Sequence, residues 1–103
     1  MRSHVERVPI PLAGELDLAN AAEVGEALEA AVAQVTGTVV CIDCAQLEFI
    51  DSSGLGVLVR FNNAATAAGY EYTVVPGPPQ VHRAFVLSGL DQALPFVAGS
   101  ARS

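Results

Sequence analysis

Two adjacent serines follow an acidic residue near the middle of the chain, in the run Asp51-Ser52-Ser53-Gly54. If a helix begins here, Asp51 is its N-cap, and we expect its carboxylate to accept hydrogen bonds from the N–H groups of Ser53 and Gly54. Ser52 would take the first helical position, with its hydroxyl near solvent. A phosphate added there would bring roughly −1.5 to −2 charges to the surface. The run is therefore either a plain helix cap or a phosphorylation switch.

The same serines are poor candidates for the nucleophile of a hydrolase. A nucleophile elbow needs the pattern Gly-x-Ser-x-Gly, and neither serine has a glycine two residues before it. A Ser-His-Asp triad would have to use His4 or His82. We expect His82 to lie on a short helix as a surface or half-buried residue. No glycine-rich phosphate loop follows a strand, which also argues against nucleotide binding.

The two cysteines, Cys41 and Cys44, have the C-x-x-C spacing of some redox and zinc sites. Zinc takes about four ligands, and both histidines are distant in the sequence. The surrounding residues have the apolar pattern of a buried strand, in which three residues span about 10 Å. A disulfide needs its Cα atoms within roughly 7 Å. We therefore predict two reduced cysteines of the core, with no metal and no cofactor.

Composition narrows the classes of function further. The chain has 103 residues, 51% of them hydrophobic, which suits one domain with a sizeable core. Its net charge is −6, and its five basic residues are all arginines, which disfavours nucleic-acid binding. The absence of lysine excludes Schiff-base chemistry and a P-loop. No apolar run approaches the ~20 residues of a membrane span, and no signal peptide is evident, so we expect a cytoplasmic protein without membrane contact.

The elements that must position these residues alternate between strands and helices. In a strand the apolar residues recur every 2 residues and in a helix every 3.6, so a change in this spacing marks the start of a helix. Glycine or proline residues end most of the segments. Strands joined by helices run parallel in one sheet, so the fold class is α/β with right-handed crossovers. We expect strands at 5–13, 38–43, 70–75 and 94–97, helices at 19–35, 52–68 and 80–88, a turn at 14–17 and a loop at 44–50.

Several local signals refine this scheme. Pro9 and Pro11 cannot donate ladder bonds, so the first strand is expected at an edge or interrupted. The continuous apolar run 38–43 predicts a central strand that is buried on both faces. Asp17 or Asn20 is expected to cap the helix 19–35.

The helix 52–68 has an unusual surface. On a helical wheel, one side carries Leu55, Leu58, Val59, Asn62 and Ala65, which suit the core. The other side is mostly small and apolar and should meet solvent. That side is either a docking surface for another protein or is covered by a neighbouring helix. It consists of Ser53, Gly56, Val57, Arg60 and Ala64.

The segment from Ile50 to Val59, IDSSGLGVLV, resembles the signature of anti-sigma factor antagonists of the STAS domain family. The run GELD at 14–17 resembles the turn after the family's first strand, and SGL at 88–90 resembles its late helix end. The match extends from about Val8 to Val97. It implies a single STAS domain over 1–103, with a core of about 8–97 and frayed ends.

The resemblance also implies an architecture. We expect a mixed, mostly parallel sheet of about four strands with helices packed on it. Members of the family usually have a strand and hairpin before the GELD segment. Only 13 residues precede Gly14 here, so the first edge strand is expected to be short or missing.

The function that the resemblance implies is partner switching, and the protein is not an enzyme. The unphosphorylated form binds an anti-sigma factor that is also a serine kinase, which releases a sigma factor for transcription, as in sporulation or stress responses. Phosphorylation of Ser52 abolishes this binding, and a PP2C-type serine phosphatase restores it. A monomer is expected, because the switch presents one helix.

The resemblance further assigns residues to the partner-binding surface. Asp17 and Asp51 match acidic positions near the serine, and Glu15 and Ser53 are weaker matches. The alternative is a non-switching STAS scaffold or accessory subunit of a stressosome-like or lipid-transport complex. Such modules typically carry threonine or another context at the serine position, so the DSSG run argues against them. The expected partner-binding residues are Asp17, Asp51, Ser52, Ser53, Gly54, Gly56, Val57 and Arg60.

Overall fold

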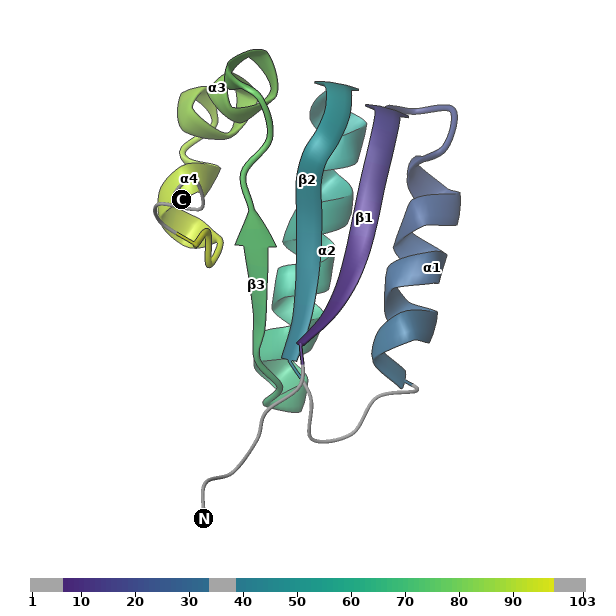
Figure 1. Cartoon of the computed structure of the whole chain (residues 1–103). Helices are drawn as coiled ribbons and strands as arrows, with labels where there is room; N and C mark the ends of the chain where they lie inside the picture. Colours follow the sequence, from purple (N-terminus) through teal and green to yellow (C-terminus); the bar gives the residue numbers. More distant parts are fainter. Residues whose placement is uncertain (1–6, 34–38, 98–103) are drawn as a thin grey trace.

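The structure is a computed structural model that describes residues 7–33 and 39–97. Its three strands all run parallel, in the order β1-β2-β3, and helices connect them (Figure 1). This arrangement confirms the α/β class and the mostly parallel character of the sheet, and the described residues contain no antiparallel strand that would make it mixed. The elements are β1 (Arg7–Leu16), α1 (Ala21–Ala33), β2 (Val39–Ile50), α2 (Ser52–Ala68), β3 (Tyr72–Val75), α3 (Pro79–Leu87) and α4 (Leu90–Ala93).

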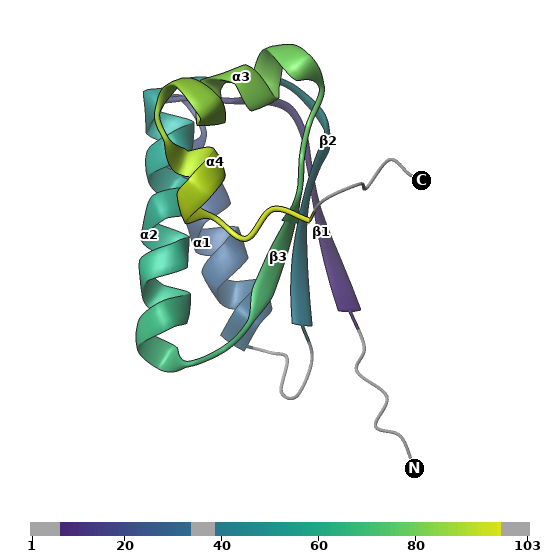
Figure 2. The same cartoon turned by 90° about the vertical axis from the view of Figure 1, so that its left-hand side faces the viewer.

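The helices cover one face of the sheet. Figure 2 shows α1 and α2 on the same side, with α3 across the end of the strands, while none of the described helices lies on the opposite face. The prediction that the central strand is buried on both faces is therefore wrong. Burial alternates along β2, with Val40 and Ile42 buried but Val39 and Cys41 only half-buried. The apolar run marks a central position in the sheet and not a second covering layer.

The first two strands are longer than the sequence predicts. β1 pairs with β2 from Arg7 opposite Val39 to Leu16 opposite Ile50. The expected turn at 14–17 and loop at 44–50 are both largely strand, which corrects those two predictions. Register shifts between Pro11 and Ala13 and between Gly14 and Glu15 absorb the irregular residues. β1 lies at an edge of the described sheet, as its prolines indicate.

The last expected strand, 94–97, is reduced to a bridge between Val74 and Phe96. The Val74 N–H donates to Pro95 at 3.0 Å, and the Val97 N–H donates back to Val74 at 2.9 Å. The sheet thus has three strands in the described part of the chain, and not the expected four. A further strand before β1 would fall on residues 1–6, which lie outside the described residues, as do 34–38 and 98–103.

The helix boundaries are close to expectation because their end signals are local. α2 covers 52–68 as predicted, and Gly69 closes it in the left-handed region with φ of 80°. α3 begins at Pro79, which occupies the first helical position, and it ends at Leu87. The core lies between the sheet and these helices. Its fully buried members include Leu16, Leu28, Ile42, Leu47, Leu58 and Phe85.

Candidate functional site

The N-terminus of α2 is attached to the C-terminal end of β1. The N–H of Asp51 donates a hydrogen bond to the backbone carbonyl of Leu16 at 3.2 Å. Gly54 is packed against the same carbonyl, because a Cβ on Gly54 would stand 2.6 Å from the Leu16 oxygen. Only glycine fits there. The serine pair between Asp51 and Gly54 is therefore fixed against the end of the sheet, where parallel α/β folds commonly place their sites.

Asp51 is the N-cap of α2, as the sequence predicts. Its backbone is extended, with φ of −115° and ψ of −171°, and its carboxylate accepts from the Gly54 N–H at 3.1 Å. Of the two expected donors in this described segment, Gly54 makes the bond and Ser53 does not. Ser52 follows as the first helical residue and is exposed, while Ser53 is half-buried. The hydroxyl-bearing residue at the start of the helix is thus open to solvent.

The segment between β1 and α1 is held by its own polar side chains. The Asp17 carboxylate accepts from the Ala19 N–H at 3.1 Å, and the Asp17 N–H donates to the Asn20 side chain at 2.9 Å. The Asn20 amide in turn donates to the Glu15 carbonyl at 2.7 Å. Neither side chain accepts from an N–H of the described helix α1, which begins at Ala21, so the predicted side-chain cap is wrong, and both residues instead fix the turn before the helix. With its neighbours bonded in this way, Leu18 projects outward and is 78% exposed.

These two segments enclose a shallow groove of about 300 Å³ between the first turns of α1 and α2. The expected binding residues Ser52, Ser53, Gly56 and Arg60 all line it. Asp51 lies directly before them as the cap. The structure thus brings a neutral hydroxyl pair, a side-chain-free glycine and an arginine to one surface. The opposite wall consists of Leu18, Ala21 and Ala22.

Four of the predicted binding residues do not line this groove: Asp17 and Asp51 stand beside it, and Val57 and Gly54 are buried. Val57 is only 2% exposed, and its Cγ1 lies 3.8 Å from the position of a Cβ on Gly25 of α1. Gly54 is buried against Leu16. The prediction that Val57 belongs to an exposed docking face is therefore wrong, because α1 packs on that side of α2. The alternative, that a neighbouring helix covers this face, holds for Val57, while Gly56 and Arg60 stay on the groove.

Leu18 is one of three groove residues that the sequence did not identify. A leucine immediately after Asp17 has no place in the period of either the strand or the helix, which is the signal that could have identified it. Ala21 and Ala22 were missed for a different reason. They were assigned to the helix 19–35 without a direction, and small residues at its start give no sign of which neighbour they face.

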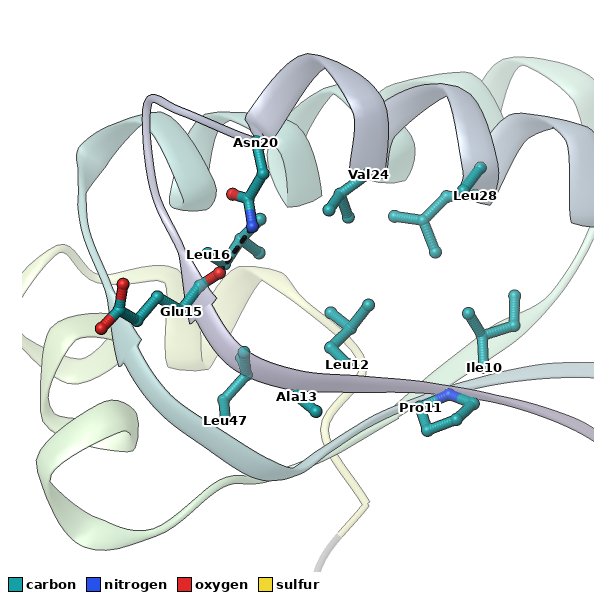
Figure 3. Close-up of a pocket in the computed structure, with 11 residues that line it drawn as sticks. Ile10, Pro11, Leu12, Ala13, Glu15, Leu16, Asn20, Val24, Leu28 and Leu47 are labelled. Atoms are coloured by element: carbon teal, nitrogen blue, oxygen red, sulfur yellow. Dashed lines mark hydrogen bonds between the residues drawn. The ribbon is translucent and has the colours of Figure 1, made fainter.

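A second hollow, of about 250 Å³, lies between β1 and α1 (Figure 3). Figure 3 shows its walls to be mainly aliphatic, with the Asn20 amide already bonded to the Glu15 carbonyl. It therefore offers no convergent set of polar side chains for chemistry among the described residues. Its aliphatic lining comes from Ile10, Pro11, Leu12, Ala13, Leu16, Val24, Ala27, Leu28 and Leu47.

Both cysteines are free thiols, Cys41 half-buried and Cys44 buried. Burial, together with the neighbouring Asp43 carboxylate, raises the pKa of Cys44 to about 12. A thiol with so high a pKa is a poor nucleophile and a poor metal ligand near neutral pH. Over 7–33 and 39–97, no three side chains of the metal-ligating types gather at one point. In the same residues, no helix has the length and apolarity that crossing a bilayer requires.

Comparison with known proteins places this chain in a family. The family model described as "Mlab, STAS domain" matches residues 1–98. The chain is 30% identical over 96 residues to an anti-sigma F factor antagonist of Paenibacillus polymyxa, covering 93% of this chain and 82% of that protein.

Solved structures agree with this assignment. The unphosphorylated form of the anti-sigma factor antagonist SpoIIAA matches with a TM-score of 0.72 and 26% identity, over 94% of this chain and 83% of that one. The phosphorylated form of SpoIIAA from Bacillus matches with a TM-score of 0.65 and 25% identity, over 94% and 86%. An anti-sigma factor antagonist from Mycobacterium paratuberculosis matches with 0.73 and 29%, over 94% and 81%. The chain therefore belongs to the STAS domain family, among its anti-sigma factor antagonists, which are binding proteins and not enzymes.

Proposed function

We propose that the protein is a phosphorylation-switched antagonist whose unphosphorylated form binds an anti-sigma factor and thereby frees a sigma factor. The observation that carries this proposal is the position of Ser52. Its side chain is exposed at the first residue of a capped helix, on the rim of a groove between two helices. A partner that covers the groove must cover this hydroxyl as well.

The switch follows from charge. The anti-sigma factor, acting as a kinase, transfers the γ-phosphoryl group of ATP to Oγ of Ser52, so that an O–P bond forms, the bond to ADP breaks, and the hydroxyl proton passes to a base of the kinase. The product carries roughly −1.5 to −2 charges where the partner met a neutral hydroxyl. A partner complementary to the neutral groove is then repelled and must also desolvate a dianion. A PP2C-type phosphatase reverses the change by hydrolysis.

The structure suits binding better than catalysis by this chain itself. Among the residues that the structure describes, the groove is lined by one arginine and by no carboxylate or histidine. Asp17 and Asp51 flank it but are hydrogen-bonded to neighbouring backbone N–H groups, which suits a role in shaping the surface. We further propose that the protein acts as a monomer in the cytoplasm, with Asp17, Asp51, Ser52, Ser53, Gly56 and Arg60 at or beside the interface.

The test is to map phosphate on the protein isolated from its own cells, in growing and in stressed cultures, by tandem mass spectrometry. We expect phosphate on Ser52 with an occupancy that changes with condition, and co-purification of a kinase with the unphosphorylated form. Unmodified serines in every condition would refute the switch and favour a non-switching STAS scaffold.

A further inference from the structure

Arg60 lines the groove, and the direction of its side chain along α2 suggests a role beyond contact with the partner. It belongs to α2, two turns after the serine pair, and its side chain is exposed. Its Nη1 atom lies 3.5 Å from the position that a Cβ on Gly56 would occupy. The guanidinium is therefore folded back along the helix toward the N-terminus, the direction that helical side chains favour. It covers the surface that Gly56 leaves empty.

This direction points the guanidinium at the serines. Gly56 follows Ser53 by three residues and Ser52 by four, so all lie on neighbouring positions of one helical surface. A guanidinium beside Gly56 is about one helical turn, or roughly 5 Å, from the serine side chains. A phosphoserine is longer than serine by a whole phosphate group, which shortens this separation. Ser52, Ser53 and Arg60 also line the same groove.

We propose that Arg60 is the phosphate-binding residue of the phosphorylated form, with its N–H groups donating to the phosphate oxygens on Ser52. This inference rests on the proposed function, since it assigns a role to the state in which Ser52 is modified. Guanidinium and phosphate are matched in shape and charge, because the planar fork can donate two parallel hydrogen bonds. In the unphosphorylated form the same guanidinium stays open to the partner.

If Arg60 binds the phosphate, phosphorylation changes the charge of the groove in two ways. Without Arg60, the modification only adds negative charge. With Arg60, it also withdraws a cation that lines the groove from the partner, because the guanidinium becomes engaged within the chain. Binding is thus lost through a repulsive group that appears and an attractive group that is removed.

The test uses the full chain with phosphoserine placed at position 52 by genetic code expansion, so that no kinase is needed. Phosphorus NMR then follows the second ionisation of the phosphate as the pH changes. An adjacent guanidinium favours the dianion, so we expect Arg60→Gln to move the titration midpoint upward by a few tenths of a pH unit. Arg83→Gln is the matched control, because Arg83 is an exposed arginine on α3 away from the groove.

The outcomes are distinct. A midpoint that rises in Arg60→Gln and stays constant in Arg83→Gln supports the assignment. An unchanged midpoint in Arg60→Gln, or an equal rise in both variants, overturns it. Adding salt should shrink the difference between the parent and Arg60→Gln, as an exposed ion pair requires. Because the phosphate is installed directly, these results do not depend on whether cells phosphorylate Ser52, which the mass spectrometry tests separately.

Discussion

The backbone carbonyl of Leu16 accepts a hydrogen bond from the N–H of Asp51 at 3.2 Å, and so joins the last residue of β1 to the cap of α2. The same oxygen bounds the space above Gly54, where a Cβ would stand only 2.6 Å away. The position of the serine pair is thus set by the end of β1 as well as by its own helix. The GELD segment at the end of β1 and the DSSG segment at the start of α2 therefore contact each other at this carbonyl, and we call this contact the joint.

The joint predicts opposite effects for the same substitution at two glycines of α2. Gly54→Ala should destabilise the fold by about 1–3 kcal/mol, because the methyl group would overlap the Leu16 carbonyl and the Ile50 side chain. Gly56→Ala meets only the Arg60 guanidinium at 3.5 Å, so helix propensity should stabilise it by about 0.5–1 kcal/mol. Urea denaturation measures both. Equal stabilities of the two variants would contradict the joint.

The cap itself can be tested at Asp51. Asp51→Ala removes the acceptor for the Gly54 N–H and should cost about 0.5–2 kcal/mol in the free energy of unfolding. Asp51→Asn keeps an oxygen in place and should retain most of that stability, since asparagine caps as well as aspartate. Thermal unfolding of the two variants makes the comparison. If asparagine were as harmful as alanine, the carboxylate charge and not the cap would be what matters.

The parts of the fold that the sequence predicts are those whose signals lie in neighbouring residues. The cap at Asp51 and the span of α2 were both predicted, because the signals at each end of this helix are local. The extension of β2 through 44–50 was not, since it depends on pairing with β1 across two register shifts. Those residues lack a clean alternation, so only the partner strand shows that they are extended.

The residues of the groove also divide into those with a local signal in the sequence and those whose position depends on a distant element. Ser52, Gly56 and Arg60 were identified because they lie on one helix with a recognisable signature. Val57 was placed wrongly because its exposure depends on where α1 packs, and a helical wheel carries no information about a neighbouring helix. Leu18 was missed because it becomes part of the groove only when the loop before α1 packs beside α2.

Leu18 should contribute to partner binding and not to stability. It is 78% exposed on the groove, whereas Leu87 is 77% exposed at the end of α3 and does not line the groove. Each leucine replaced by serine should change the free energy of unfolding by less than about 0.5 kcal/mol. Only Leu18→Ser should weaken binding to the anti-sigma factor, by roughly tenfold, as expected for an apolar contact at an interface. Titration calorimetry against the co-purified partner compares them, and equal affinities would remove Leu18 from the interface.

Stability should fall in alkaline solution through Cys44. Burial raises the pKa of its thiol to about 12 in the folded chain, whereas the unfolded thiol titrates at about 9. Between these values the unfolded state releases a proton that the folded state retains, so the folded state loses stability as pH rises. Below pH 9 both states are protonated and the full stability is present.

The measurement is urea denaturation at a series of pH values from neutral to alkaline. Cys44→Ala removes the thiol, so it should lower stability at neutral pH through the lost packing, but with a shallower decline above pH 9. Tyr72→Phe is a useful companion, because burial raises the pKa of the Tyr72 hydroxyl to about 12 and its proton is donated to Asn62 at 2.7 Å. If the free energy of unfolding declined equally with pH in the parent chain, Cys44→Ala and Tyr72→Phe, other groups would control the alkaline transition.

The charge switch is tested most directly at Ser52 with variants that separate binding from folding. Ser52→Ala keeps the site neutral and should bind the anti-sigma factor like the parent chain while escaping phosphorylation. Ser52→Asp places a carboxylate at the first turn of α2, where the helix dipole favours it, so the fold should be as stable as the parent or slightly more so.

The same carboxylate should weaken binding by at least about tenfold, which corresponds to about 1.4 kcal/mol, because the partner meets a negative charge in place of a hydroxyl. Gln80→Asp is the matched control, since Gln80 is exposed in the first turn of α3 and does not line the groove. It places the same charge at another helix start, so its affinity for the partner should equal that of the parent chain. Parent-like affinity of Ser52→Asp, measured alongside its thermal unfolding, would show that charge at Ser52 does not operate the switch. A loss of affinity without a loss of stability would show that it does.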